Sequence, residues 1–439
     1  MRAVLLAGCV LALVTPPALA QSATLSGPDG TSLDKVLVIG TDGTRWDRVQ
    51  AVIRAGRGPN FDRLRRAGFG VTSRLDYGPG TLTISEVGWS SIASGVWENK
   101  HGINGTKGNK DPGQATKNGY LDFLTRLEQG RPSLSTFIAS DWDNLALPLN
   151  GGPIFGTAMD AKLPVRVTTE SLAAWDAGDE TVTREAARYL RRGDPDAGFV
   201  YLGLVDESAH LAGSATPTYT RAIATTDGRI GRLLAAIRAR PSYPFESWTI
   251  LVTTDHGERP LSEPSVAAHY GTTALERTVF VIGTGPGLGG VRRARVIDVH
   301  PTVLHQLGVR IDPAWRLDGR SLSRAGQASS ASASLRGGRL VARLKLGARP
   351  RGVCSVSFRL PAGLRASTAS VRSNGRRLGA VTLGAGGRTV TTRLDGRALR
   401  TLTLAARVSG TAGDGELTVT LRPSRGRLGT LSLPLRSGG

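Results

Sequence analysis

The segment Val36-Leu-Val-Ile-Gly40 runs directly into Thr41-Asp42-Gly43. A short apolar run closed by a glycine-containing turn is typical of a buried strand. The same pattern recurs in three later segments, Gly198–Val205, Trp248–Thr253 and Thr278–Ile282. Between these segments, apolar residues at helical spacing predict helices over Asp179–Arg192 and Tyr219–Arg240. Alternating buried strands and helices indicate a three-layer α/β domain, in which helices cover both faces of a central, mostly parallel sheet.

The α/β pattern stops near Leu322, where the composition changes. Residues 326–334 are small and polar, and we interpret them as a flexible Ser/Ala linker. Beyond them apolar and polar residues alternate, as in Cys354-Ser-Val-Ser-Phe358, and Asn374-Gly375 is a tight-turn signal. The sequence therefore predicts an α/β domain at residues 21–325, the linker, and a small all-β, sandwich-like domain at residues 335–439.

The first twenty residues have the anatomy of a signal peptide. Arg2 precedes an apolar run, and Ala18-Leu-Ala20 offers a cleavage site before Gln21. We therefore expect residues 1–20 to be removed and the protein to be secreted. The alternative is a lipoprotein signal at Cys9, although few apolar residues precede this cysteine. No later stretch of the sequence has the roughly eighteen uninterrupted apolar residues that a membrane-spanning helix needs.

The net charge of +21 is concentrated near the C-terminus. From Leu335 onward, twenty Lys and Arg face three Asp and Glu, a net charge of +17. Two interpretations are open: a solvated basic surface, or electrostatic binding of an anionic polymer or surface, such as wall phosphopolymer, lipid or nucleic acid. Phe358 is the only aromatic residue of this segment, which disfavours stacking on bases or sugars.

Cleavage of the signal peptide would leave Cys354 as the only cysteine. A single thiol excludes an intramolecular disulfide and a thiolate metal cluster. Any metal must then be held by histidines and carboxylates.

Acidic and histidine side chains follow the predicted strands where the strands end. They are Asp42 after the first strand, Asp206 and His210 after the second, Asp255 and His256 after the third, and His269 a little further on. Ligands of open α/β sheets gather beyond the carboxyl ends of the strands. Each residue alone could be a turn, cap or core residue. Their joint occurrence predicts a metal centre, because Asp and neutral His are the ligands of zinc-like ions where no thiolate is available.

Four motifs resemble the type I phosphodiesterase/nucleotide pyrophosphatase branch of the alkaline phosphatase superfamily. They are Val38-Ile-Gly-Thr-Asp42-Gly, the segment from Ser85 through His101-Gly-Ile103, Asp206-x-x-x-His210, and Thr254-Asp255-His256-Gly. The resemblance runs from about Val36 to Leu322 and does not cover the C-terminal β domain. It implies an alkaline-phosphatase-like fold and hydrolysis of phosphodiester or pyrophosphate bonds in a substrate such as a nucleotide.

The resemblance also implies roles for individual residues. Two divalent ions, with zinc as the expected metal, would be bound by two sets: Asp42, Asp255 and His256 with the nucleophile, and Asp206, His210 and His269. The family's nucleophile lies sixteen positions before the His of His-Gly-Ile, which is Ser85 here, and it forms a phospho-serine intermediate. Thr106 stands where the family has a phosphate-contacting Asn, and the neighbouring Asn104 is a second candidate for that role. His269 follows His256 by only thirteen residues, which is closer than in the best-known members.

Other functions are known on the same fold, and some of them differ in the residues that they require. An alkaline phosphomonoesterase or phosphonate monoester hydrolase would use the same residues. A sulfatase would need a Cys or Ser in a C/S-x-P-x-R context, and Ser85-Glu-Val-Gly-Trp89 lacks both the Pro and the Arg. An inert binding protein is disfavoured because every expected ligand type and a nucleophile are present.

Overall fold

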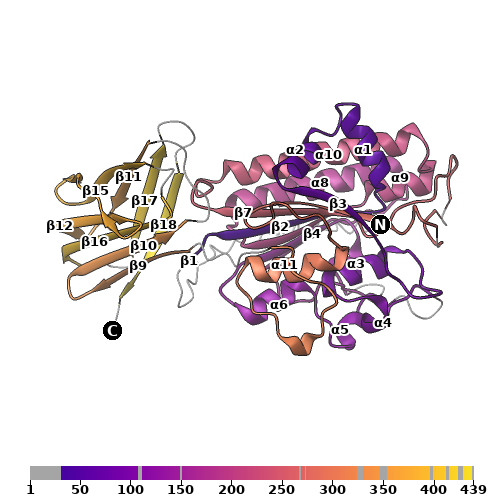
Figure 1. Cartoon of the computed structure of the whole chain (residues 1–439), viewed down its shortest axis with the longest axis horizontal. Helices are drawn as coiled ribbons and strands as arrows, with labels where there is room; N and C mark the ends of the chain where they lie inside the picture. The colour runs from indigo at the N-terminus through magenta and orange to yellow at the C-terminus, as the bar shows by residue number, and fades with distance from the viewer. Residues whose placement is uncertain are drawn as a thin grey trace, which may run out of the picture.

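The computed structural model describes residues 31–106, 111–148, 151–265, 268–271, 273–323, 330–346, 353–395, 399–411, 415–423 and 429–437. The predicted signal peptide, including Cys9, and residues 326–329 of the predicted linker lie outside these ranges. Figure 1 shows an α/β region, which holds most of the helices, beside a smaller region built of strands.

Seven strands form the central sheet of the α/β region, in the order β3-β8-β7-β2-β6-β4-β5. They are β2 (Asp34–Thr41), β3 (Phe69–Arg74), β4 (Thr136–Ser140), β5 (Ala161–Pro164), β6 (Ala197–Leu202), β7 (Ser247–Thr253) and β8 (Thr278–Thr284). Strands β7, β2, β6, β4 and β5 are parallel, whereas β8 runs antiparallel to β7 and to β3. The predicted mostly parallel sheet is therefore confirmed.

Helices cover both faces of this sheet and complete three layers (Figure 1). On one side lie α1 (Trp46–Arg54), α2 (Pro59–Ala67), α8 (Leu172–Arg192), α9 (Leu204–Ala212) and α10 (Pro217–Ala239). On the other lie α3 (Ser85–Ser94), α4 (Glu98–His101), α5 (Gln114–Lys117), α6 (Phe123–Gly130), α7 (Asp143–Ala146) and α11 (Val299–Gln306), with 3-10 turns at Val296–Asp298 and Pro313–Trp315. None of the helices described here is long and apolar enough to cross a membrane.

The first apolar run of the sequence lies in strand β2, and its residues do not alternate between apolar and polar. All eight of its residues are buried, because both faces of the strand are covered. Leu37 and Ile39 enter the hydrophobic cluster on the α10 side, while Val36 and Val38 enter the cluster on the α3 side. Successive side chains of a strand point to opposite faces, so this single segment ties the two layers together.

The C-terminal region is all β, as predicted. Its strands are β9 (Ser330–Arg336), β10 (Arg339–Lys345), β11 (Val353–Arg359), β12 (Leu364–Ser373), β13 (Arg376–Arg377), β14 (Val381–Gly384), β15 (Thr389–Asp395), β16 (Thr401–Gly410), β17 (Glu416–Pro423) and β18 (Gly429–Ser437). They follow the order β13-β12-β16-β10-β9-β18-β17-β11-β15-β14 around one hydrophobic cluster. Asn374 and Gly375, at φ 48° and 80°, join β12 to β13 in the predicted tight turn.

The predicted linker is wrong over Ser330–Ser334, because these residues lie in strand β9. This strand pairs with β10, β18 and a short N-terminal strand, β1 (Thr31–Ser32). The Ser-Ala repeat, interpreted above as flexible, is in fact a strand pattern of period two. Ala331 and Ala333 are buried in the β core, while the serines between them are partly exposed.

The β region contacts the α/β region beside the first residues of β2 and β7. Leu33 and Phe245 both belong to the hydrophobic cluster of the β region. The Ser247 amide donates to Leu33 O over 2.8 Å, and the Thr430 amide donates to Pro241 O over 2.9 Å. The β region therefore lies at the amino ends of these strands, opposite the ends that carry the predicted site.

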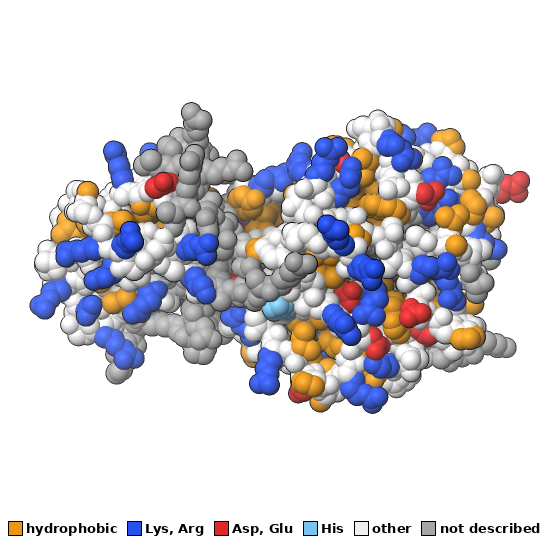
Figure 2. Space-filling model, viewed as in Figure 1, with side chains coloured by type: hydrophobic (Ala, Val, Ile, Leu, Met, Phe, Trp, Pro, Cys, Tyr) orange, Lys and Arg blue, Asp and Glu red, His pale blue; other side chains and the backbone are white. Residues whose placement is uncertain are grey.

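Basic side chains gather on the β region. Figure 2 shows many Lys and Arg side chains over its visible face and few acidic ones. Across the neighbouring strands β9, β10 and β16, Arg336 stands opposite Arg339, and Arg339 stands opposite Arg407. All three side chains are exposed. Like charges directly opposite each other on a sheet are unfavourable, so this row is maintained against electrostatic repulsion.

Candidate metal centre

Asp42 follows β2 at its carboxyl end and is almost fully buried. Its Oδ2 accepts hydrogen bonds from Trp89 Nε1 (2.9 Å) and from the Tyr201 hydroxyl (2.5 Å). The other oxygen, Oδ1, lies 3.4 Å from Ser85 Oγ and 3.4 Å from His256 Nε2. One half of the carboxylate is thus fixed by donors, and the other half is directed at the predicted nucleophile.

Asp255 and His256 follow β7, the strand beside β2. The Gly43 amide donates to Asp255 Oδ1 over 3.2 Å, which ties the turns after the two strands together. His256 Nε2 lies 3.2 Å from Asp255 Oδ2 and 3.4 Å from Ser85 Oγ. The donor atoms of Asp42, Asp255 and His256 all lie within 4.8 Å of one another, so the structure brings the first predicted ligand set together.

Asp206 and His210 reach the centre from a helix, not from a strand end. Strand β6 stops at Leu202, not at Val205 as predicted, and both residues lie on α9. Residues four apart share one face of a helix. His210 Nε2 consequently lies 3.2 Å from Asp206 Oδ2.

His269 completes the second predicted set. Its Nε2 lies 2.9 Å from His210 Nε2 and 3.7 Å from Asp206 Oδ1. Its Nδ1 lies 2.6 Å from the Thr83 carbonyl, an atom that can only accept. The proton therefore sits on Nδ1 and leaves the Nε2 lone pair directed at Asp206 and His210, an arrangement usual for metal-binding histidines.

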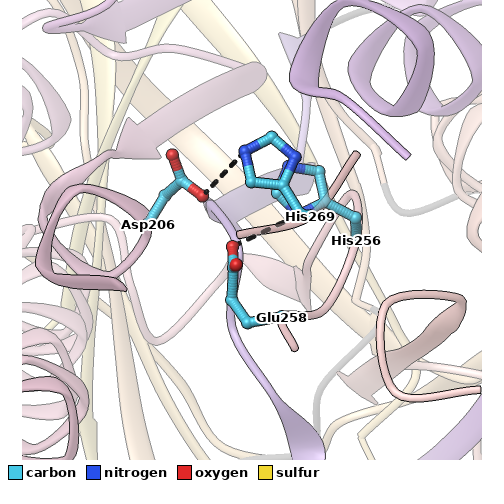
Figure 3. Close-up of side chains that lie close together, drawn as sticks. All are labelled: Asp206, His256, Glu258 and His269. Atoms are coloured by element: carbon cyan, nitrogen blue, oxygen red, sulfur yellow. Dashed lines mark ion pairs between the residues drawn. The ribbon is translucent and has the colours of Figure 1, made fainter. Parts of the chain in front are cut away.

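The structure adds Glu258 to the cluster, a residue that no motif of the sequence analysis includes. The donor atoms of Asp206, His256, Glu258 and His269 lie within 4.8 Å of one another. Figure 3 shows the Glu258 carboxylate directed toward His256, with Glu258 Oε1 3.7 Å from His256 Nδ1. Glu258 stands two positions after His256, and its complete burial, which the sequence does not show, is what distinguishes it.

The electrostatics of the cluster suit cations. Burial lowers the pKa of His256 and of His269 to about 4, so both rings are neutral at pH 7, the form that binds metal. Burial, together with repulsion from Asp206, raises the pKa of Asp42 to about 6. Asp206 Oδ1 and Asp255 Oδ2 are buried, and neither has a hydrogen-bond partner in the described part of the chain. Buried carboxylate oxygens left in this state are compensated by a bound cation, so the residues fit divalent ions.

Ser85 is the first residue of α3. Thr83 and Ser90 also carry hydroxyl groups in this segment, and neither hydroxyl makes the contacts with Asp42 and His256 that Ser85 makes. The Thr83 hydroxyl donates to the carbonyls of His269 and Gly271, so it is occupied in holding the His269 loop. Ser90 is buried, and no hydrogen-bond partner of its hydroxyl is found among the described residues.

The two predicted phosphate-contacting residues lie in a loop beside the segment that leads into Ser85. The Leu82 amide donates to Asn104 O over 2.9 Å. Asn104 Oδ1 accepts from the Thr106 amide (3.0 Å) and from the Thr106 hydroxyl (2.7 Å). Within the described part of the chain, neither residue contacts the Asp and His cluster through a hydrogen bond or ion pair.

The sequence model of the type I phosphodiesterase / nucleotide pyrophosphatase family matches residues 36–294. This is more than half of the 439 residues, and the chain belongs to that family. It is therefore a phosphoester hydrolase of the alkaline phosphatase superfamily.

Three solved structures illustrate the similarity. BT1596, a 2-O GAG sulfatase, has 12% identity, a TM-score of 0.46, and coverage of 72% of this chain and 81% of that chain. Murine ectonucleotide pyrophosphatase / phosphodiesterase 5 has 14% identity and a TM-score of 0.46, covering 64% and 96%. The alkaline phosphatase PafA has 14% identity and a TM-score of 0.39, covering 52% and 63%. No curated protein matches the chain.

Proposed function

We propose that this protein is an exported hydrolase of phosphodiester or pyrophosphate bonds that uses Ser85 as its nucleophile and two divalent ions, zinc being the expected metal. The observation that carries the proposal is the position of Ser85 Oγ, 3.4 Å from both Asp42 Oδ1 and His256 Nε2. Ser85 also begins helix α3, and the backbone N–H groups of a helix N-terminus attract phosphoryl oxygens.

The reaction would proceed by two displacements at phosphorus. Two ions, when bound, make the serine alkoxide accessible at neutral pH and neutralise charge on the phosphoryl oxygens. The Ser85 alkoxide forms a bond to phosphorus while the bond to the leaving-group oxygen breaks. The phospho-Ser85 intermediate still carries the second ester group of the substrate. Water then hydrolyses the bond between phosphorus and the Ser85 oxygen, which regenerates the serine and releases a phosphomonoester.

Substrate recognition is assigned to the loop beside Ser85. Because Asn104 Oδ1 is occupied by Thr106, the Asn104 amino group is the donor left for a phosphate oxygen. A phosphomonoesterase or a phosphonate monoester hydrolase is the alternative on the same centre. Zinc-loaded enzyme assayed on bis-nitrophenyl phosphate, nitrophenyl phosphate, a phosphonate monoester and nitrophenyl sulfate separates these activities and the sulfatase. The proposal expects the diester to give the highest kcat/KM.

The nucleophile is tested by a pair of Ser→Ala variants on the same helix. Ser85→Ala should lower turnover by several orders of magnitude while both ions stay bound. Ser90→Ala removes a buried hydroxyl for which no partner is found among the described residues, and it should keep near-wild-type turnover. Equal turnover in the two variants would contradict the assignment.

We also propose that the C-terminal region binds an anionic polymer. The supporting observation is the row formed by Arg336, Arg339 and Arg407. Arg343, two residues beyond Val341 on β10, is also exposed and lies on the same face of the strand as Arg339. The residues between them on that face are small, which leaves the guanidinium groups open to phosphate oxygens. With Phe358 buried in the core, the region offers no aromatic platform for bases or sugars, so the contact would be electrostatic.

The surface is tested with linear polyphosphate as the probe. The triple change Arg339→Gln, Arg343→Gln and Arg407→Gln should weaken binding at least tenfold and lower its salt dependence. The control triple, Arg359→Gln, Arg393→Gln and Arg422→Gln, removes the same charge from exposed positions on β11, β15 and β17. If both triples weaken binding alike, net charge rather than this face is responsible.

A further inference from the structure

Glu258 is a fully buried carboxylate, and the contacts it makes with the described residues do not compensate for the loss of its hydration. Its relative exposure is 0%, and neither Oε1 nor Oε2 has a hydrogen-bond partner among the residues that the structure describes. No Lys or Arg of the described ranges forms an ion pair with it. Its one ion-pair contact among the described residues is with the His256 ring, whose Nδ1 lies 3.7 Å from Oε1 and which is neutral at pH 7. A buried, unpaired carboxylate is unfavourable, so its presence calls for a compensating partner.

The space in front of Glu258 is shared with Asp206. A Cβ built on Gly43 would lie 2.4 Å from Asp206 Oδ1 and 2.7 Å from Glu258 Oε1. Both oxygens thus converge on the small volume that the glycine leaves free. Asp206 Oδ1 is also buried, and no described residue forms a hydrogen bond with it. When both carboxylates are ionised, their converging oxygens repel each other unless a cation lies between them.

The histidines close this space from the other side. His256 and His269 stack with ring centroids 3.9 Å apart, and their donor atoms lie within 4.8 Å of those of Asp206 and Glu258. Figure 3 shows the four side chains grouped around one region, with the carboxylates approaching from different elements. Two carboxylates and imidazole nitrogen form a ligand set suited to zinc and to similar divalent ions.

We propose that Glu258 is a metal ligand in addition to the six predicted Asp and His residues, and that it binds the same ion as Asp206 and His269. The inference rests on the two-ion centre of the proposed function. It adds a fourth carboxylate to Asp42, Asp206 and Asp255, and so makes the centre more strongly attractive to cations.

The test measures metal affinity and the stability of the metal-free protein, independently of turnover. Glu258→Gln keeps the shape and removes the charge. It should lower the affinity for one of the two ions at least tenfold, measured by competition with a chromophoric zinc chelator, and leave the other unchanged. The metal-free variant should unfold at a temperature no lower than that of metal-free wild type, because a repulsive contact is removed. Zinc should raise that temperature less than it does in wild type.

Glu246→Gln is the matched control. Glu246 is also buried, but it pairs with Arg240 and lies before β7, at the opposite end of the strand from His256. This variant should lose stability without zinc and bind both ions as wild type does. If Glu258→Gln behaves in the same way, Glu258 is a structural residue and the inference is overturned.

A second variant, Glu258→Leu, keeps the test decisive if the buried amide of Glu258→Gln prevents that variant from folding. It should also lose affinity for one ion while the metal-free protein stays folded; wild-type affinity would overturn the inference. Failure of the proposed function looks different: wild type itself would bind fewer than two ions or show no Ser85-dependent hydrolysis.

Discussion

Tyr201→Phe should weaken metal binding although Tyr201 belongs to neither ligand set. The Tyr201 hydroxyl donates to Asp42 Oδ2 over 2.5 Å, inside the protein. Phenylalanine keeps the ring and its contacts with Trp89, so the change removes one hydrogen bond and creates no sizeable cavity. Of the two donors to Asp42 Oδ2, Trp89 Nε1 then remains.

The expected magnitude follows from the kind of bond that is lost. A buried hydrogen bond to a charged group contributes about 1.5–3 kcal/mol. Removal of a group that orients a metal ligand reduces affinity by about 10- to 100-fold, and tenfold corresponds to about 1.4 kcal/mol. Since Trp89 still holds the same oxygen, we expect an effect near tenfold on the ion bound by Asp42, with a similar fall in kcat/KM.

Chelator competition on purified protein measures this affinity, and urea unfolding of the metal-free form measures stability. Tyr219→Phe is the control. The buried Tyr219 hydroxyl donates to Gly43 O (2.6 Å) and accepts from the Arg45 amide (2.9 Å), so it does not donate to a metal-binding carboxylate. It should cost stability with little change in affinity. Wild-type affinity in Tyr201→Phe would refute the view that the two donors orient Asp42 for metal binding.

Three further predictions concern other parts of the α/β region. Gly88→Ala should disturb the centre, because a Cβ there would lie 2.6 Å from Asp255 Cβ. Metal affinity should fall, and the free energy of unfolding in urea should drop by about 1–3 kcal/mol. The control is Gly228→Ala on α10, where no atom of the described residues outside the helix lies within 4 Å of the added Cβ; it should gain about 0.5–1 kcal/mol in the same assay. Lys35→Met leaves the buried Asp196 without its 2.8 Å partner and should cost about 3–5 kcal/mol by the same assay; a loss below about 1 kcal/mol would contradict this. Burial raises the pKa of Glu128 to about 7, so the folded state holds a proton that the unfolded state releases above about pH 4.3. The free energy of unfolding should therefore fall as the pH rises from about 4.3 to about 7. Glu128→Gln should lose this pH dependence and be more stable than wild type at pH 8. Parallel pH profiles for the two proteins would contradict the last prediction.

The sequence predicted the parts of this structure that follow from local pattern. The apolar runs identified β2, β6, β7 and β8, and the polar residues after β2 and β7 do meet at one edge of the sheet. The boundary of β6 was wrong because Val205 continues the apolar run, although it belongs to a buried helix. Periodicity cannot separate a buried strand from the buried first turn of a helix.

Other features depend on contacts between distant segments, which no local pattern encodes. Glu258 is distinguished only by burial next to Asp206, fifty-two residues earlier in the chain. Tyr201 and Trp89 read as core aromatics, and only the fold directs their polar atoms at Asp42. The Ser-Ala repeat became a strand because β10, β18 and the N-terminal β1 supply its partners. Composition alone favoured a linker there.

The most direct test of the central claim is to locate the covalent phosphate. Zinc-loaded protein is mixed with a nitrophenyl diester, quenched in acid during turnover, digested and mapped by mass spectrometry. The proposed reaction predicts a peptide in which Ser85 carries the phosphoryl group together with the ester group that has not been expelled. This peptide should be absent from Ser85→Ala and retained in Ser90→Ala. A phosphoryl group on another residue, or undiminished hydrolysis by Ser85→Ala, would overturn the assignment of Ser85 as the nucleophile.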